Sequence, residues 1–260
     1  MVVIRRYLVR RLAAAGMAVL LPGAAHAGAL DTLSDAWLHG LAQQQAPAIW
    51  SHAVVARQET RERLPQLQRR LVAELDTLVA SARLAGADPL GQGLAEWRAQ
   101  VTQADQDTMR TPGRHDLLWI AADLRRDLPL SQVKHLGLCT PPSWVEVWHH
   151  SGITRVDWQP GMTLRDAVEG LPRSAWALAN QAAVVTPSGD RVLKGVASWN
   201  RETASLAPGS RVMLALPEAQ GLRAAMPFPG TVEEVSWVNR ELPAFLATRL
   251  PADQCTLWEP

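Results

Sequence analysis

Cysteine, tyrosine and phenylalanine are scarce in this sequence. Its 260 residues include two cysteines, one tyrosine and two phenylalanines, beside 11 tryptophans. Two cysteines, Cys139 and Cys255, cannot make a structural zinc site by themselves. The hydrophobic content of 47% is ordinary for a globular protein. A chain of this length can therefore form one large domain or two small ones with a real core.

An excess of positive charge is also missing. The net charge is +1, but four arginines lie within the first 27 residues, where there is no acidic residue. The remaining chain has 22 basic and 25 acidic residues, a net charge of about −3. Such a surface gives no electrostatic reason to bind nucleic acid.

The short motifs that mark common enzymes are absent. The sequence has no Gly-x-Ser-x-Gly, His-Glu-x-x-His, Walker or Gly-x-Gly-x-x-Gly motif. His149 and His150 are neighbours in a strand-like stretch, so they point to opposite faces and cannot chelate one metal. Asp123 and Asp127 read as turn residues rather than as the carboxylate pair of a glycosidase. We therefore expect a protein that is not an enzyme, with no catalytic residue, cofactor or metal site.

No apolar run is long enough to span a membrane, and the one at the N-terminus predicts export. Four arginines precede the ten-residue run Leu12–Leu21, and Ala25-His26-Ala27 fits the small-x-small cleavage rule. Residues 1–27 are thus expected to be a signal peptide cut between Ala27 and Gly28. No lipobox cysteine follows. The alternative is an N-terminal anchor; either way we expect the mature protein in the periplasm.

Helical periodicity dominates the first part of the mature chain. Leu30–Leu41 has an apolar face that ends before Pro47. Glu59–Leu84 is the longest regular stretch, with leucines spaced three and four apart. Gly86–Gly91 interrupts it, and a second helix follows with Leu94 and Trp97 on its apolar face. Together these stretches predict an antiparallel helical hairpin over about 59–106.

Strand patterns surround this hairpin. Ile49–Ala56 is a short strand or a loop cover, while Asp116–Ala122 and Val133–Leu138 are expected strands. These later strands are the nearest surface on which the apolar stripe of the hairpin could be buried. Trp97 and Trp119 are expected to pack the hairpin against that sheet.

The stretch 144–216 has the pattern of one compact unit. Trp144–Trp148 alternates as a strand does, and Thr163 with Asp166 has the form of a helix N-cap. Proline and glycine turns then separate three further strands, at Ala182–Thr186, Arg191–Trp199 and Arg211–Leu216. The order strand, strand, helix, strand, strand, strand predicts a mixed sheet wrapped around one helix, which is the β-grasp (ubiquitin-like) arrangement.

An amphipathic helix is expected near the C-terminus. Glu218–Gly230 is loop-like, and Thr231-Val-Glu-Glu234 has the form of a capping box. The apolar face then runs to about residue 250, and Pro243 should kink the helix or end its regular hydrogen bonding. The charges on this helix argue against a membrane span. It packs on its own domain, lies on a membrane surface or enters a partner's groove.

The cysteines and tryptophans leave two alternatives each. In an oxidising compartment Cys139 and Cys255 would pair and tie the tail to the domain junction; otherwise both are buried thiols. The tryptophans either fill the core or stack on sugar rings. The four that could form an exposed row in the sheet are Trp144, Trp148, Trp158 and Trp199.

Several short sequence motifs resemble those of one known family. Pro160-Gly161 with Thr163-Leu164, the turns Pro187–Asp190 and Leu206–Ser210, and above all Val196-Ala-Ser-Trp-Asn200 are similar to the last β-grasp domain of the GfcC-type capsule biosynthesis family. The likeness continues less sharply through the helical region and the C-terminal helix. It therefore covers most of the mature chain.

The resemblance implies a fold of class α+β with two β-grasp domains. Residues 28–138 would be the first, truncated and carrying the helical hairpin as an insertion, and residues 139–217 the second. The amphipathic helix 231–250 would pack on the second domain, followed by a tail at 251–260. The family's Gly-Arg at the domain junction matches Gly113-Arg114, which implies a structural salt bridge from Arg114 to Asp157, Glu233 or Asp123. The other interpretation is a solvated arginine.

Three functions remain. The resemblance implies a non-catalytic periplasmic accessory of capsule or exopolysaccharide assembly and export, with an outer-membrane polysaccharide exporter or pore as partner. Exposed tryptophans would instead make a polysaccharide-binding module. An envelope hydrolase would need a cleft with convergent carboxylates or a Ser/His pair.

Overall fold

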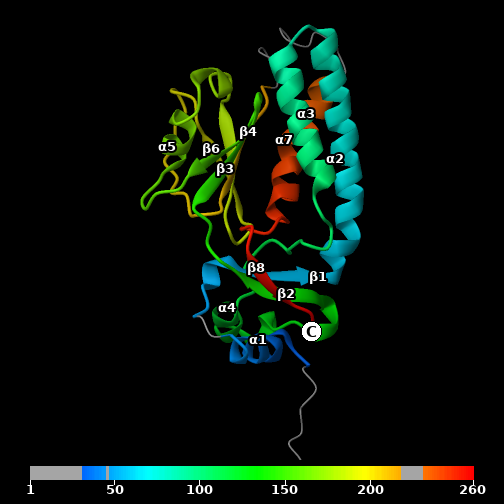
Figure 1. Ribbon diagram of the computed structural model, residues 1–260, viewed down its shortest axis with the longest axis vertical. Coiled ribbons are helices and arrows are strands. Elements are labelled where there is room, and N and C mark those ends of the chain that lie inside the picture. Colours follow the sequence, from blue (N-terminus) through cyan, green and yellow to red (C-terminus); the bar gives the residue numbers. More distant parts are fainter. Residues whose placement is uncertain (1–30, 45–46, 218–230) are drawn as a thin grey trace, which may run out of the picture.

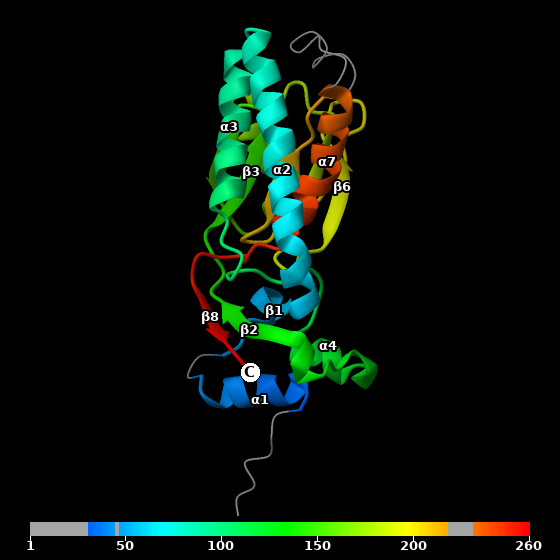
Figure 2. The same cartoon turned by 90° about the vertical axis from the view of Figure 1, so that its right-hand side faces the viewer.

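The computed structural model describes residues 31–44, 47–217 and 231–260 and has a mixed α+β architecture (Figure 1). The described strands form one sheet of five strands and one of three. The larger sheet lies beside three long helices, and the smaller sheet lies at the end of the molecule that carries the C-terminus (Figures 1 and 2). The expected signal peptide, its cleavage point at Ala27 and Gly28, and the expected loop 218–230 lie outside the described residues.

Two neighbouring inner strands of the larger sheet run parallel. Its strands are β3 (Trp144–His149), β4 (Gly152–Asp157), β5 (Gln181–Val185), β6 (Arg191–Gly195) and β7 (Arg211–Leu214). Their order is β4-β3-β7-β5-β6, with β3 parallel to β7 and every other pair antiparallel. Both β6 and β7 end earlier than the sequence pattern predicts.

One face of this sheet is covered by the short helix α5 (Leu164–Glu169). Thr163 and Asp166 form the expected capping box, with each side chain hydrogen-bonded to the other residue's backbone N–H. Because strand side chains alternate, Val145 and Val147 point to this face and join its apolar cluster. The residues between them point to the opposite face.

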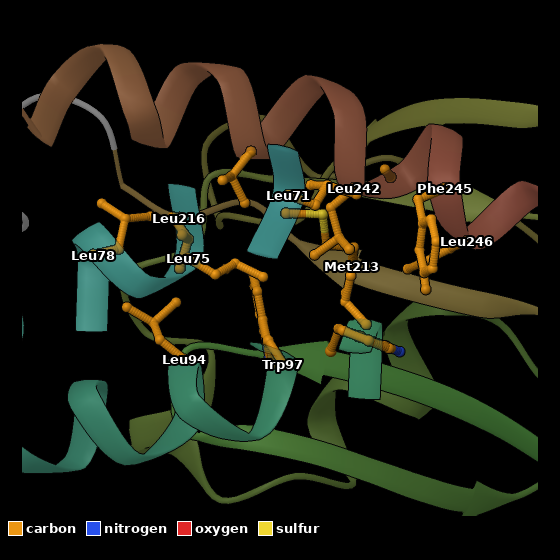
Figure 3. Packing of buried hydrophobic residues seen from close by; sticks show 14 of the residues in the cluster. Leu71, Leu75, Leu78, Leu94, Trp97, Met213, Leu216, Leu242, Phe245 and Leu246 are labelled. Carbon is orange, nitrogen blue, oxygen red and sulfur yellow. The ribbon is translucent and has the colours of Figure 1, made fainter. Parts of the chain in front are cut away.

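Three helices cover that opposite face: α2 (Gln58–Leu84), α3 (Asp88–Gln103) and α7 (Thr231–Ala247). Figure 3 shows leucines of α2 and α3 meeting α7 and the sheet in a continuous apolar core. The hairpin of α2 and α3 is as the periodicity predicts, but its apolar stripe packs on α7 and the large sheet rather than on the strands that directly follow it. α7 continues through Pro243 to Ala247.

Close contact fixes α3 against the β3–β4 turn. A Cβ atom at Gly93 would collide with the backbone carbonyl of His150, so only glycine allows this approach. Four residues on, the buried Trp97 donates from its indole Nε1 to the carbonyl of Gly152 over 3.1 Å. Trp97 also packs against Trp148, with ring centroids 5.8 Å apart. The tryptophan thus packs the hairpin on a sheet as expected, although on the larger one.

The smaller sheet takes one strand from the C-terminal tail. It consists of β1 (Ala53–Arg57), β2 (Val133–Cys139) and β8 (Cys255–Trp258), in the order β1-β2-β8 and antiparallel throughout. Helices α1 (Leu33–Ala42) and α4 (Leu117–Ala121) pack beside it. Short 3-10 turns lie at Trp50–His52, Leu124–Arg126, Leu130–Gln132 and Arg173–Ala175. The tail expected at 251–260 is therefore partly a strand.

The strand expected at Asp116–Ala122 is wrong, because this segment is the helix α4. Asp116 caps it by accepting a hydrogen bond from the backbone N–H of Trp119. Ile120 is the buried residue of α4, while Trp119 is part-exposed under the guanidinium of Arg126, 3.7 Å from its ring centroid. Trp119 therefore does not pack the hairpin against a sheet.

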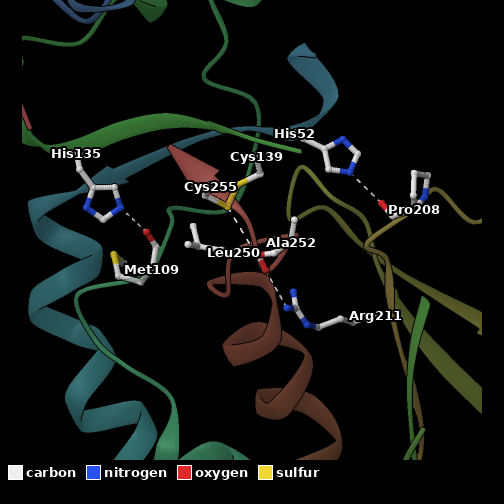
Figure 4. Close-up of a disulfide and its surroundings, with 9 residues drawn as sticks. All are labelled: His52, Met109, His135, Cys139, Pro208, Arg211, Leu250, Ala252 and Cys255. Carbon is white, nitrogen blue, oxygen red and sulfur yellow. Dashed lines mark hydrogen bonds between the residues drawn. A yellow bond between two sulfur atoms is a disulfide. The ribbon is translucent and has the colours of Figure 1, made fainter. Parts of the chain in front are cut away.

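A disulfide joins the central strand of the smaller sheet, β2, to its edge strand, β8. Cys139 closes β2 and Cys255 opens β8, and their Sγ atoms are bonded across 116 residues of sequence (Figure 4). The bond fastens the tail beside the junction of the two sheets. Across the described ranges, no helix is both long and apolar enough to cross a membrane.

Candidate functional site

A polar cleft lies between β3, β4 and β7 of the larger sheet, the C-terminal end of α3 with the segment after it, and the C-terminal end of α7 with the segment after it. Its volume is about 430 Å³. We call it the junction cleft. It is lined by Gln100, Gln103, Ala104, Asp105, Thr108, Glu146, Trp148, Arg155, Arg211, Phe245, Leu246, Arg249, Leu250, Ala252 and Asp253.

The buried carboxylate of Glu146 is the centre of the cleft. Glu146 lies on β3 between Trp144 and Trp148, and strand alternation points all three away from α5. Its Oε1 accepts from Trp148 Nε1 at 2.9 Å and from Arg211 Nε at 3.2 Å, and its Oε2 accepts from Arg155 Nε at 3.3 Å. One carboxylate therefore holds two guanidinium groups and an indole in place.

A second carboxylate completes this network from the tail. The carboxylate of Asp253 accepts hydrogen bonds from both terminal nitrogens of Arg155, Nη1 at 2.9 Å and Nη2 at 3.1 Å. It also accepts one from the indole Nε1 of Trp144 at 3.2 Å. Burial alone would raise the pKa of Asp253, but the hydrogen bonds and charge of Arg155 outweigh it and lower that pKa. The guanidinium of Arg155 also lies 4.2 Å from the centroid of the Trp144 ring. The segment after α7 is thereby fixed to the large sheet.

Arg211 is buried and links the network to the end of α7. Besides Glu146, it donates from Nη2 to the backbone carbonyl of Leu250 over 2.8 Å (Figure 4). Burial lowers the pKa of Arg211, and the charge of Glu146 works against that shift. Because the ion pair of Arg211 and Glu146 is buried, removal of either side chain would leave the other charge buried without a partner.

Two further arginines near the cleft have no carboxylate partner among the described residues. Arg249 donates to the backbone carbonyls of Asp105 and Thr108 at 2.6 and 3.1 Å. Arg110 is almost wholly buried and donates to the carbonyls of Ala247 and Thr186 at 2.9 and 3.1 Å. Burial, with the nearby charge of Arg211, lowers the pKa of Arg249 to about 10 and that of Arg110 to about 9. The C-terminal carbonyl end of α7 favours such cations.

Arg114, which the resemblance singles out, forms a different salt bridge from those expected. Its guanidinium pairs with Asp116 over 2.9 Å, and its side chain is 48% exposed. None of Asp157, Glu233 and Asp123 is its partner, because the chain turns sharply at Gly113 and places the neighbouring acid of the α4 cap against it. The hydrogen bonds that Arg114 donates to the carboxylate of Asp116 raise the pKa of Arg114. The buried arginines near the cleft are Arg110 and Arg211 instead.

The four tryptophans considered for glycan stacking do not form one exposed row. Trp144 and Trp148 are both buried on the face that points away from α5, and Trp148 belongs to the core beneath α2, α3 and α7. Trp158 packs beside the opposite core and donates from Nε1 to the carbonyl of Leu206 at 2.7 Å. Trp199 is 76% exposed. Of the four, it alone offers a free ring face.

The cleft's lining is polar and rich in arginine. Its lining contains no histidine, serine or cysteine, and both of its buried-network carboxylates are held by arginine. His149 lies elsewhere, buried and hydrogen-bonded to Ser151 and Thr154, and burial lowers its pKa. The described residues include no group of three or more acids, histidines or cysteines that could hold a metal.

Sequence reasoning missed the residues that build this cleft. The one signal was Glu146, a charge in the middle of an otherwise apolar strand pattern. Arg211 opens another strand and gave no sign that it would be buried, since the pairing of β3 with β7 joins positions 65 residues apart.

The family resemblance is confirmed over the C-terminal part of the chain. Residues 152–251 match the family model described as capsule biosynthesis GfcC C-terminal. The match begins at β4, runs through α7 and includes Arg155, Arg211 and Arg249 of the junction cleft. Over these residues the chain is similar to the GfcC-type capsule biosynthesis family, which supports the resemblance seen in the sequence.

Proposed function

We propose that the protein is a non-catalytic accessory of capsule or exopolysaccharide assembly and export, which acts through protein contacts in the periplasm. The family of residues 152–251 supports a role in capsule biosynthesis. The N-terminal pattern of arginines followed by an apolar run supports export. The arginine-bound carboxylates of the junction cleft support binding rather than turnover.

We propose further that residues 139–217 form a β-grasp domain. The strand order with two parallel inner strands, and α5 on one face, support this arrangement. The first domain, 28–138, would be the truncated one, completed by β8 from the tail. The hairpin of the first domain packs, with α7, on the larger sheet of the second domain. The two domains would therefore act as one unit.

The observation that carries the protein-contact proposal is the free edge of β6. Within the described residues β6 pairs on one side only, with β5. Val192 and Leu193 are exposed on it, Leu193 by 65%. An edge strand with exposed apolar side chains is a ready template for an added strand.

A groove beside this edge indicates the partner's chemistry. The groove has a volume of about 420 Å³ and lies between β5, β6 and α7. Its lining includes Arg191, Leu193 and Arg240 and no carboxylate. An extended segment of an envelope export protein, apolar at alternate positions and carrying acidic residues, would fit it.

Complementation of a deletion strain tests the proposal. Loss of the gene should lower surface polysaccharide, and Leu193→Asp should fail to restore it because the aspartate removes the apolar contact and repels an acidic partner. Leu124→Asp is the matched control, since Leu124 is 74% exposed at the far end of the molecule. Normal surface polysaccharide in the deletion strain would refute the accessory role. If Leu193→Asp restores surface polysaccharide fully, β6 is not the contact surface.

The exposed ring of Trp199 favours a second candidate function, polysaccharide binding. A solvent-facing indole can stack on a sugar ring. Affinity electrophoresis in the cognate polysaccharide should then show retardation that Trp199→Ala abolishes. Equal mobility of the two proteins would exclude stacking at this ring.

A further inference from the structure

The junction cleft contains more hydrogen-bond donors than its own acceptors use. Each guanidinium has five N–H groups. Two nitrogens of Arg211 and two of Arg249 donate to protein atoms. Both oxygens of Glu146 and both of Asp253 already accept from the protein. The arginines of the cleft therefore keep N–H groups that its two buried-network carboxylates cannot accept, and such donors suit an anionic ligand.

Arg249 is the most suitable group to receive such a ligand. Every salt bridge of the cleft's described residues involves Arg155 or Arg211. Arg249 forms no salt bridge among them, and the carboxylate of Asp105, which also lines the cleft, acts on its charge only from a distance. The carbonyls of Asp105 and Thr108 hold its side chain in place before any ligand arrives. A fixed guanidinium loses little freedom on binding and can meet a carboxylate with two parallel hydrogen bonds.

We propose that the junction cleft binds the carboxylate of an acidic sugar, with Arg249 as its principal partner. The cleft's volume of about 430 Å³ is within the range of small-ligand sites, roughly 300–1,000 Å³. Gln100, Gln103 and Thr108 line it beside Arg249 and offer amides and a hydroxyl for the sugar's own hydroxyl groups. The choice of a sugar over an acidic peptide rests on these groups and on the capsule role proposed above.

Calorimetric titration with galacturonic acid oligomers tests this proposal on the full exported chain. We expect measurable binding of the acidic sugar and roughly tenfold or weaker binding of the matching galactose oligomer, because a charge-assisted bidentate contact is lost. Arg249→Gln should weaken binding of the acidic sugar by a similar factor. Thermal melting of the variant checks that it folds.

A second variant leaves the arginine in place. Gln103 is exposed at the end of α3, so Gln103→Glu adds a negative charge at the rim without disturbing the core and should also weaken binding. Arg165→Gln, on the far side of the large sheet, removes a surface arginine and should leave binding unchanged. If the galactose oligomer binds as tightly, or if both cleft variants bind normally, the proposal is wrong.

The last titration uses a tetraglutamate peptide, which carries carboxylates but no sugar hydroxyl groups. Tighter binding of this peptide than of the acidic sugar would overturn the sugar assignment and point to an acidic protein segment. The proposed function is judged separately by the deletion strain. A protein that binds no acidic sugar while its deletion still lowers surface polysaccharide would refute only this inference.

Discussion

Replacing Glu146 by glutamine should destabilise the protein far more than removal of any exposed acid. The substitution keeps the shape of the side chain but removes the charge that faces Arg211 and Arg155. Arg155 retains its bidentate contact with Asp253. Arg211 would keep its 2.8 Å hydrogen bond to the carbonyl of Leu250 but would stay buried with no carboxylate opposite its charge.

The size of the stability loss in Glu146→Gln depends mainly on Arg211, because Arg211 is the arginine that is left without a carboxylate partner. Removal of one member of a buried ion pair costs roughly 3–5 kcal/mol, because the other charge stays buried and uncompensated. The Arg155 contact adds little, since the half-exposed guanidinium is solvated and a surface pair is worth about 0–1 kcal/mol. For a protein of this size, 1 kcal/mol shifts Tm by about 2–4 °C. The expected loss in Tm for Glu146→Gln is therefore roughly 6–20 °C.

Thermal denaturation followed by circular dichroism measures this difference. Asp76→Asn is the matched control, because it removes the carboxylate of the exposed Arg98–Asp76 pair and should shift Tm by less than about 4 °C. The double variant Glu146→Leu, Arg211→Met should regain much of the loss, since no unpaired charge remains buried. A Glu146→Gln protein that melts with the wild type would refute the buried ion pair.

Three other predictions concern the junction, the hairpin and pH. Alkylation without reductant should leave the mass unchanged because Cys139 and Cys255 are bonded, and replacing both by alanine should lower the free energy of unfolding by about 4–5 kcal/mol in chemical denaturation; a mass increase would contradict the bond. Gly93→Ala should lower that free energy by roughly 1–3 kcal/mol, since its Cβ would press on the carbonyl of His150; an unchanged urea midpoint would show that α3 can shift freely. Burial lowers the pKa of His135, so its proton is bound more weakly in the folded state, and stability should fall as pH drops from the unfolded pKa of about 6.5 through the lowered folded value. His135→Gln should reduce this loss in melting curves between pH 7 and 5, and an equal slope in both proteins would remove His135 as the cause.

Local sequence patterns were enough for the long helices and for the order of strands and helix along the stretch that forms the larger sheet. The leucine spacing from residue 59 to 84 gave α2 to within one residue, and Thr163 with Asp166 gave the cap of α5. These features depend on neighbours three or four residues apart, so the sequence contains them directly.

Local sequence patterns could not predict contacts between segments that are far apart in the chain. The segment of α4 has too few residues to show a period, and Asp116 decided its conformation by capping it. β8 is a strand only because β2 offers an edge about 120 residues away, which explains why the tail looked unstructured. The partner of Arg114 and the burial of Arg110 and Arg211 likewise depend on how the sheets and α7 meet.

The junction cleft exists only when the whole described chain is folded together. The family match begins after β3, so Glu146 and the end of α3 lie outside residues 152–251, while Arg155, Arg211 and Arg249 lie inside. An isolated 152–251 fragment would carry the cleft's arginines without Glu146, and its sheet would lose β3 and the cover of α2 and α3. Unpaired cations and an uncovered apolar face both oppose folding. The helical hairpin is thus part of the cleft's construction as well as of the core, and any ligand of the cleft would couple to the packing of that hairpin.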